Sequence, residues 1–150
     1  MSQRAAWQLE RFGIVDVHDF VYGKSYWIGS GRPTEGTIDL DARVLAHLST
    51  DVSTVAPGAS VADVRTVLAA DAHGIVLVVN EARVILGTVR AATLESADDA
   101  QPVGEVMRIG PTTVRPDESA AAVRERMAKR NVSSLAVSRP TGELIGLLTA

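Results

Sequence analysis

The sequence predicts an α/β (α+β) protein built mainly from two copies of one β-α-β-β unit. Residues 54–91 align with residues 113–150 without a gap, at a constant offset of 59 positions, and such self-similarity marks a repeated structural unit. Hydrophobic residues make up 46% of the 150-residue chain, whereas aromatic residues make up only 4%. The core must therefore consist mainly of aliphatic side chains, as in β-branched strands packed against alanine-rich helices.

The two copies agree at both turn and core positions. The identical pairs are Thr54/Thr113, Val55/Val114, Pro57/Pro116, Ser60/Ser119, Val64/Val123, Arg65/Arg124, Val78/Val137 and Gly87/Gly146. The alternative is an ordinary α/β domain with fortuitous similarity, but chance does not readily produce an ungapped match at so many positions. The repeat is therefore the basis of the predicted fold.

Each copy begins with a Thr-Val strand and a proline turn that leads into a helix. Ser60 and Ser119 stand near the expected helix starts. Both helices keep apolar residues at i, i+3 and i+7, which indicates a single buried stripe. The stripes are Val61, Val64 and Leu68 in the first copy and Ala120, Val123 and Met127 in the second. Two strands follow each helix, expected at 75–79 and 84–89 and at 134–138 and 143–149, with a turn over 139–142.

Short helices are expected before both copies, at 41–48 and 103–107, and a helix with an acidic end, 91–99, closes the first copy before Pro102. Each unit would form a small sheet with helices on one face, so that the other face stays apolar and needs a partner. We therefore expect the two sheets to pack face to face as a pseudo-twofold pair. The predicted divisions are an N-terminal extension (1–40), a first repeat (41–100) and a second repeat (101–150).

The composition excludes several classes of function. The net charge of −3 lacks the positive excess that nucleic-acid backbones require. The longest wholly apolar run, 75–79, is far too short to span a bilayer, and the polar start does not resemble a signal peptide. With no cysteine, disulfides and thiolate chemistry are excluded for this sequence. A cytoplasmic protein that binds neither nucleic acid nor membrane is expected.

The second copy resembles a cystathionine-β-synthase-type (CBS) domain. The resemblance rests on a V-x-x-V-M helix (Val103, Val106, Met107), a T-V-x-P-D-x-S turn (113–119) and an h-G-h-h-T ending at Thr149. It extends over roughly residues 41–150, with the first copy as the weaker match. The resemblance implies a pseudo-twofold CBS pair that is regulatory rather than enzymatic. It also implies a homodimer, an unidentified regulated partner protein, and an adenosine-type ligand (AMP, ADP, ATP or S-adenosylmethionine) between the sheets.

The resemblance also implies candidate ligand-binding residues. They are Thr54, His73, Gly74, Arg90, Thr93, Thr112, Thr113, Ser133, Ser134 and Thr149. The sequence departs from the family pattern of Ser/Thr-x-x-Asp, because Arg90 and Thr93 replace the hydroxyl and the ribose-binding aspartate in the first copy. In the second copy Thr149 is kept, while the aspartate position and the closing helix would lie after Ala150.

Two interpretations of these departures remain open. Arg90 could contact a phosphate as a bidentate cation, or it could be a solvated arginine at a strand end. The threonine and serine hydroxyls could contact ligand or serve only turns and caps. The functional alternative is accordingly a ligand-free dimerisation or interaction module whose nucleotide site is degenerate.

The N-terminal extension resembles the C-terminal end of a rhodanese-like domain. Its expected order is a helix around residues 6–10, a strand over 14–20 and a short helix over 25–31. The residues that carry the resemblance are Leu9, Phe12, Gly13, Gly23, Lys24, Trp27, Gly31, Pro33, Glu35 and Gly36. The catalytic cysteine of that family is missing, so no sulfurtransferase activity is expected. Trp7 and Trp27 are expected to pack on the CBS pair or on a second chain.

No other chemistry is predicted. His18, His47 and His73 are far apart in sequence and match no metal-ligand spacing. Neither a Ser-His-Asp arrangement nor a carboxylate pair can be argued from spacing. We therefore predict no enzyme activity, no metal and no cofactor apart from the regulatory nucleotide.

Overall fold

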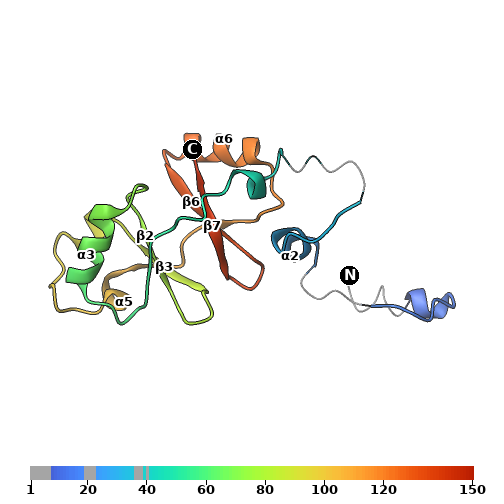
Figure 1. Ribbon diagram of the computed structural model, residues 1–150, viewed down its shortest axis with the longest axis horizontal. Helices are drawn as coiled ribbons and strands as arrows, with labels where there is room; N and C mark the ends of the chain where they lie inside the picture. Colours follow the sequence, from blue (N-terminus) through green and yellow to red (C-terminus); the bar gives the residue numbers. More distant parts are fainter. Residues whose placement is uncertain (1–7, 19–22, 36–38, 40) are drawn as a thin grey trace.

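The computed structural model describes residues 8–18, 23–35, 39 and 41–150. Within this part of the chain, two small mixed sheets carry helices on their outer sides, as Figure 1 shows for α3 and α6. The predicted α/β fold class with two repeats packed sheet to sheet is confirmed. None of the helices in the described residues is long and apolar enough to cross a bilayer.

The first repeat contains a four-stranded sheet in the order β1-β2-β3-β4. The strands are β1 (Thr54–Val55), β2 (Val76–Val79), β3 (Ile85–Val89) and β4 (Arg108–Ile109). β1 is parallel to β2, whereas β2–β3 and β3–β4 are antiparallel. The sequence did not predict β4, which comes from the segment that precedes the second repeat.

The second repeat contains a three-stranded sheet in the order β5-β6-β7. The strands are β5 (Thr113–Val114), β6 (Ser134–Ser138) and β7 (Leu144–Thr149). β5 is parallel to β6, and β6 is antiparallel to β7. The hairpin turn predicted over 139–142 is confirmed by the hydrogen bond from the Gly142 amide to the Arg139 carbonyl, at 2.9 Å.

The main helix of each repeat begins at the predicted serine. α3 (Val61–Ala70) and α6 (Ala120–Lys129) are capped by the hydroxyls of Ser60 and Ser119, which accept hydrogen bonds from backbone amides of the first turn. The apolar stripes face the sheets, with Val61, Val64, Val123 and Met127 fully or almost fully buried. Ser60 and Ser119 therefore define both helix starts.

The short helices are smaller than expected. Residues 41–48 form only the 3-10 helix η1 (Val44–His47), and the helix expected over 91–99 is the single turn α4 (Ala91–Leu94). The predicted helix at 103–107 is present as α5 (Val103–Val106). The acidic residues after α4 lie in turns, where side chains of Asp and Glu are readily hydrated and hydrogen-bond to nearby amides.

The two repeats exchange the segments that precede them. In Figure 1, η1 lies beside α6 of the second repeat, whereas α5 lies on the side of α3 in the first. The Val44 amide donates a hydrogen bond to the Glu118 carbonyl at 3.0 Å, and the Val103 amide donates one to the Ala59 carbonyl at 2.8 Å. Val44 is buried in the core of the second repeat, and Val103 in that of the first.

These exchanged contacts obey a pseudo-twofold symmetry with the 59-residue offset of the sequence repeat. The isolated bridge between Arg43 and Ser119 is the counterpart of that between Pro102 and Ser60, since each pair of equivalent residues differs by 59. The bridge between Val84 and Glu143 joins two residues that are themselves equivalent. The axis therefore passes between the two β-hairpins.

A third apolar cluster lies between the sheets. It contains Ile75, Leu77, Ala136, Leu144 and Leu147, with Val52, Val79 and Ile85 packed against it. Since Leu77 and Ala136 are equivalent positions of the two repeats, both central strands contribute the same face to this cluster. This cluster covers the apolar sheet faces that would otherwise be exposed to water.

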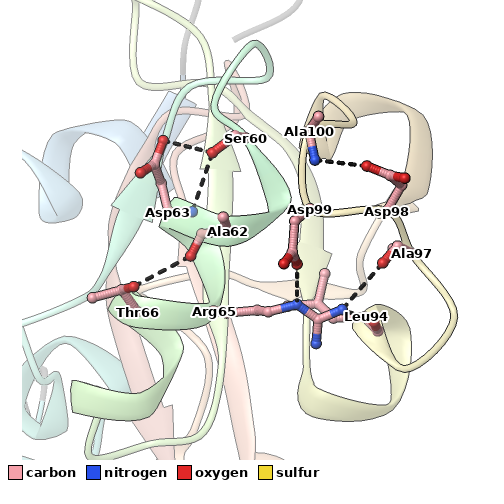
Figure 2. A network of polar contacts seen from close by, with 10 residues as sticks. All are labelled: Ser60, Ala62, Asp63, Arg65, Thr66, Leu94, Ala97, Asp98, Asp99 and Ala100. Atoms are coloured by element: carbon pink, nitrogen blue, oxygen red, sulfur yellow. Dashed lines mark hydrogen bonds and ion pairs between the residues drawn. The ribbon is translucent and has the colours of Figure 1, made fainter.

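Arg65 of α3 forms hydrogen bonds with the segment 94–99, at the end of α4 and after it (Figure 2). Its guanidinium donates hydrogen bonds to the carbonyls of Leu94, at 2.6 Å, and Ala97, at 3.2 Å, and to the Asp99 carboxylate, at 3.0 Å. The equivalent residue of α6, Arg124, reaches only the Thr149 carbonyl, at 3.3 Å. Arg65 thus satisfies carbonyls at a helix end that the short α4 cannot pair internally.

We expect Arg65→Ala to lower the free energy of unfolding by about 1–2 kcal/mol, because charge-assisted hydrogen bonds to two carbonyls are lost at a partly exposed site. Lys129→Ala is the control, since it removes only the exposed i, i+4 pair with Glu125 and should change stability by less than about 0.5 kcal/mol. Urea unfolding followed by circular dichroism measures both. Equal effects of the two substitutions would contradict a special role for Arg65.

The N-terminal extension differs from its prediction. Residues 8–11 are helical and α2 (Gly23–Gly29) supplies the predicted short helix, but residues 14–18 of the expected strand form none. Ile14 and Val15 are exposed, the latter to 99%. Within residues 8–18 the backbone has no neighbouring strand to pair with, and an extended segment without a ladder partner is not a strand. Residues 19 and 20 of that prediction, and Trp7, lie outside the described residues.

α2 contacts the second repeat near the pseudo-twofold axis. The guanidinium of Arg139, in the β6–β7 hairpin, lies 5.4 Å from the centre of the Tyr26 ring, which is cation–π geometry. Trp27 donates a hydrogen bond to the Pro33 carbonyl at 2.7 Å, and its ring lies beneath the Arg32 guanidinium at 5.1 Å. Packing of Trp27 on a second chain stays a prediction.

Candidate ligand-binding site

A cleft between the two repeats carries two arginines, and we call it the arginine cleft. It has a volume of about 230 Å³. Its lining residues come from β3, β4 and β6, from the positions just before β2 and just after β3, and from the loops that follow β4 and precede β6: Ile75, Thr88, Arg90, Arg108, Gly110, Pro111, Thr112, Val132, Ser134 and Leu135. Three of the predicted ligand residues, Arg90, Thr112 and Ser134, are thereby brought together.

Arg90 reaches across from the first repeat into the second. Its guanidinium donates a hydrogen bond to the Ser134 hydroxyl at 3.1 Å, and Ser134 is only 4% exposed. The Arg90 amide donates to the Thr93 hydroxyl at 3.3 Å, which fixes the backbone where β3 passes into α4. Arg90 is therefore half-buried and held toward the cleft, and is not a freely solvated side chain at a strand end.

Arg108 enters the same cleft because of the segment exchange. It lies on β4, which pairs with β3 so that Arg108 is opposite Thr88. Gly110 follows two residues later with a φ of 64°, a left-handed conformation that lets the chain turn back toward β5. The exchange of β4 onto the first sheet is thus what places Arg108 and Arg90 at one cleft.

The lining combines positive charge with apolar surface. Ile75, Val132 and Leu135 supply aliphatic walls, while Thr88, Thr112 and Ser134 supply hydroxyls. None of the described residues that line the cleft is acidic. Two guanidinium groups suit a phosphate or carboxylate group, and aliphatic walls suit a planar ring. Such a site can bind an amphipathic anion. Its described lining does not place a nucleophile beside a general base, as catalysis would require.

A second, smaller hollow adjoins the arginine cleft beside α6, with a volume of about 180 Å³. Thr112, Val132 and Leu135 line both hollows. Thr113, another predicted ligand residue, lies here, as does Arg126, whose guanidinium is paired with the Glu118 carboxylate at 2.6 Å. The side of the cleft nearest α6 thus continues into a partly apolar groove.

The remaining predicted residues lie elsewhere. Thr54 lines a separate hollow at the end of β1. His73, Gly74, Thr93, Ser133 and Thr149 line neither the arginine cleft nor the hollow beside α6. Thr93 acts on the Arg90 backbone, the Ser133 carbonyl accepts a hydrogen bond from the Ala150 amide at 3.1 Å, and the Thr149 carbonyl accepts one from Arg124.

His73 and Gly74 belong to a loop organised by Asp71. One Asp71 carboxylate oxygen accepts hydrogen bonds from the His73 amide at 2.9 Å and from the Ile75 amide at 3.0 Å. Burial acts to raise the pKa of Asp71, but these amides, the Ser53 hydroxyl and the charge of His73 together hold that pKa below its ordinary value. The stabilisation by ionised Asp71 is therefore present above the unfolded-state pKa and is lost as the pH falls toward the folded-state pKa.

Arg108, Thr88 and Ile75 are lining residues that the sequence did not point to. Arg108 follows the V-x-x-V-M helix directly, so a basic residue beside a recognised motif was the available signal. The sequence did not indicate that β4 pairs with β3 of the first repeat, and this pairing is what brings Arg108 to the cleft. No group of three or more His, Asp or Glu residues that could hold a metal ion occurs in the described part of the chain.

Comparison with known proteins defines this fold. Residues 103–150 match the family model of the CBS domain. No curated protein sequence matches the chain. Among solved structures, the cytosolic domain of the Mg2+ channel MgtE in complex with ATP is similar with a TM-score of 0.66 and 24% identity, over 73% of this chain. This chain covers 46% of that MgtE chain, about half of its length.

Two solved structures that are named as CBS proteins are similar over 71% of this chain at 21% identity. One is the CBS domain pair of protein MJ0100 in complex with 5-methylthioadenosine and S-adenosyl-L-methionine, with a TM-score of 0.62 and 88% of that chain covered. The other is CBSX2 in complex with AMP, with a TM-score of 0.64 and 89% covered. At these identities the likeness establishes the fold, which is that of a CBS domain pair.

These matches do not support the resemblance of residues 1–40 to a rhodanese-like domain. The matched family model begins at residue 103, and the MJ0100 and CBSX2 structures are named as CBS proteins. The described part of the extension also has no strand over residues 14–18, where the resemblance implies one. A rhodanese-like origin of this segment therefore stays a prediction without support.

Proposed function

We propose that this chain is a non-catalytic regulatory module that binds an adenosine-type ligand in the arginine cleft and thereby changes its contact with a partner protein. The observation that carries the proposal is the convergence of Arg90, Arg108 and aliphatic walls on one cleft between the repeats. The complexes of similar solved structures with ATP, AMP and S-adenosyl-L-methionine support the ligand class.

The lining accounts for the two parts of such a ligand. Ile75, Val132 and Leu135 can cover the faces of an adenine ring, because burial of apolar ring surface is favourable. The guanidinium groups of Arg90 and Arg108 can donate paired hydrogen bonds to phosphate oxygens. Ligand would compete with Ser134 for Arg90, so that binding is coupled to the contact between the two repeats.

Isothermal titration of the purified chain with AMP, ADP, ATP and S-adenosylmethionine tests the proposal. We expect binding of at least one nucleotide, and we expect Arg90→Ala to weaken it by about tenfold or more, because a charge-assisted hydrogen bond is lost. Arg83→Gln is the matched control, since Arg83 lies in the exposed turn between β2 and β3 and away from the cleft lining.

The competing proposal is a ligand-free dimerisation or interaction module. The observation that favours it concerns the described residues that line the arginine cleft. None of them carries a carboxylate that could accept hydrogen bonds from ribose hydroxyls. That proposal requires all four compounds to give no heat of binding at millimolar concentration and no shift of the melting temperature. The same result would contradict nucleotide sensing, and a dimer seen by sedimentation would then support the interaction module.

A further inference from the structure

The pseudo-twofold axis generates a position equivalent to the arginine cleft on the other side of the molecule, and its residues differ in charge. With the 59-residue offset, Arg90 is equivalent to Thr149, and Arg108 is equivalent to Ser49. Gly110 is equivalent to Asp51, which is exposed. Both arginines of the cleft are thus replaced by neutral hydroxyl residues, and a carboxylate is added.

The neighbouring charges differ in the same direction. Arg130, which lines the hollow beside α6, is equivalent to Asp71. The Asp71 carboxylate accepts hydrogen bonds from the His73 and Ile75 amides, so it is bound to the loop that contains His73 and Gly74. The arginine cleft thus carries the guanidinium groups of Arg90 and Arg108, whereas the equivalent position has no arginine at these two places and has the Asp51 carboxylate in place of Gly110. A negative ligand is therefore attracted more strongly to the arginine cleft than to the equivalent position.

The available space differs as well. Thr88 lines the arginine cleft, whereas its equivalent, Leu147, is fully buried in the apolar cluster between the sheets. A leucine fills volume that a threonine leaves open, and a buried, well-packed side chain is costly to displace. Charge and packing thus independently favour only one of the two equivalent positions as a ligand site.

We infer that each chain holds one ligand, in the arginine cleft, and that this ligand is a nucleotide recognised mainly through its phosphates rather than S-adenosylmethionine. This inference rests on the proposed function and narrows it. S-adenosylmethionine carries a sulfonium and an ammonium group against one carboxylate, so its net positive charge is opposed by Arg90 and Arg108. Without a carboxylate in the lining, ribose hydroxyls contribute little, and affinity depends on the number of phosphate charges.

Titration calorimetry of the full chain with adenosine, AMP, ADP and S-adenosylmethionine tests this inference. We expect affinity to rise from adenosine to AMP to ADP, with ADP binding at one site per chain. S-adenosylmethionine should bind at least about tenfold more weakly than ADP. ADP binding should also weaken as the salt concentration is raised, because salt screens the attraction between charges at a solvent-accessible site.

Substitutions of the two arginines supply the second part of the test. Arg90→Gln and Arg108→Gln should each weaken ADP binding by about tenfold or more, whereas Arg83→Gln should change it less than about twofold. Thermal unfolding of each variant confirms that it is folded. Arg108 is exposed, so its substitution should leave the melting temperature nearly unchanged.

The outcomes separate the inference from the function on which it rests. Binding of S-adenosylmethionine as tight as that of ADP, two equal sites per chain, or an unchanged ADP affinity in Arg108→Gln would each overturn the inference while nucleotide-type binding stands. Absence of binding by every compound would overturn both. Tight, salt-sensitive ADP binding that requires both arginines would support both.

Discussion

Leu147→Ala is expected to lower the free energy of unfolding by about 2–5 kcal/mol, because it leaves a cavity in the apolar cluster between the sheets. Leu147 is fully buried, and it packs in one cluster with residues of both repeats, including Leu77 of β2 and Ile75, which precedes β2. In a chain of this size that loss corresponds to a fall of the melting temperature by roughly 5–15 °C. Differential scanning calorimetry measures it.

Ile109→Ala is the control for this prediction. Ile109 is also a large aliphatic residue, but it is 76% exposed on β4, so its truncation should change stability by less than about 0.5 kcal/mol. If Leu147→Ala were as mild as Ile109→Ala, the two sheets would not share a packed core. The face-to-face arrangement of the repeats would then be wrong.

Gly146→Ala is expected to destabilise the protein by about 1–3 kcal/mol, because it forces the exchanged segment away from β7. A Cβ atom at Gly146 would lie 2.6 Å from the Ser49 carbonyl oxygen and 3.4 Å from the Leu48 Cβ. The Ser49 amide and carbonyl are both hydrogen-bonded to Leu147, so this backbone cannot move without losing those bonds. The repeat needs a residue without a side chain at this position.

Gly87→Ala is the matched comparison, since Gly87 is the equivalent residue of the first repeat. There a Cβ atom would lie 2.5 Å from the Met107 sulfur and 3.0 Å from the Arg108 carbonyl oxygen. The Met107 side chain is flexible and can shift, so we expect a smaller loss than at Gly146. Urea unfolding of both variants decides it, and a larger loss for Gly87→Ala would contradict the proposed contact between residues 48–49 and β7.

The repeated part of the fold was predictable because its information is local. The constant offset aligned both serine caps, both apolar stripes and the strand pairs, and the strand 134–138 agrees with β6 residue for residue. The face-to-face packing followed from sheets with one uncovered apolar face. Both statements need only periodicity and the hydrophobic effect.

The exchange of segments was not predictable in this way. β4 and η1 each pack on the repeat that is distant in sequence, and no local pattern specifies such a partner. The candidate site depended on that exchange, since it is what brings Arg108 to Arg90. Residues 14–18 show the opposite error, because an apolar sequence suggests a strand, whereas these residues form none in the structure.

The symmetry also explains why the ligand residues were only partly identified. The family resemblance pointed equally to residues of both repeats, such as His73 and Ser133, because it treats the copies alike. The structure differs between the copies where a few side chains change, as with Thr88 against Leu147. A ligand site formed at the junction of two repeats depends on these differences more than on the shared motif.

A crystal structure of the chain grown with ADP tests the central claim most directly. The account predicts electron density for one nucleotide per chain in the arginine cleft, with phosphate oxygens within hydrogen-bonding distance of Arg90 and Arg108. The equivalent position beside Leu147 and Ser49 should contain no nucleotide. Nucleotide density at that second position, or an arginine cleft without nucleotide in crystals grown at a saturating ADP concentration, would contradict it.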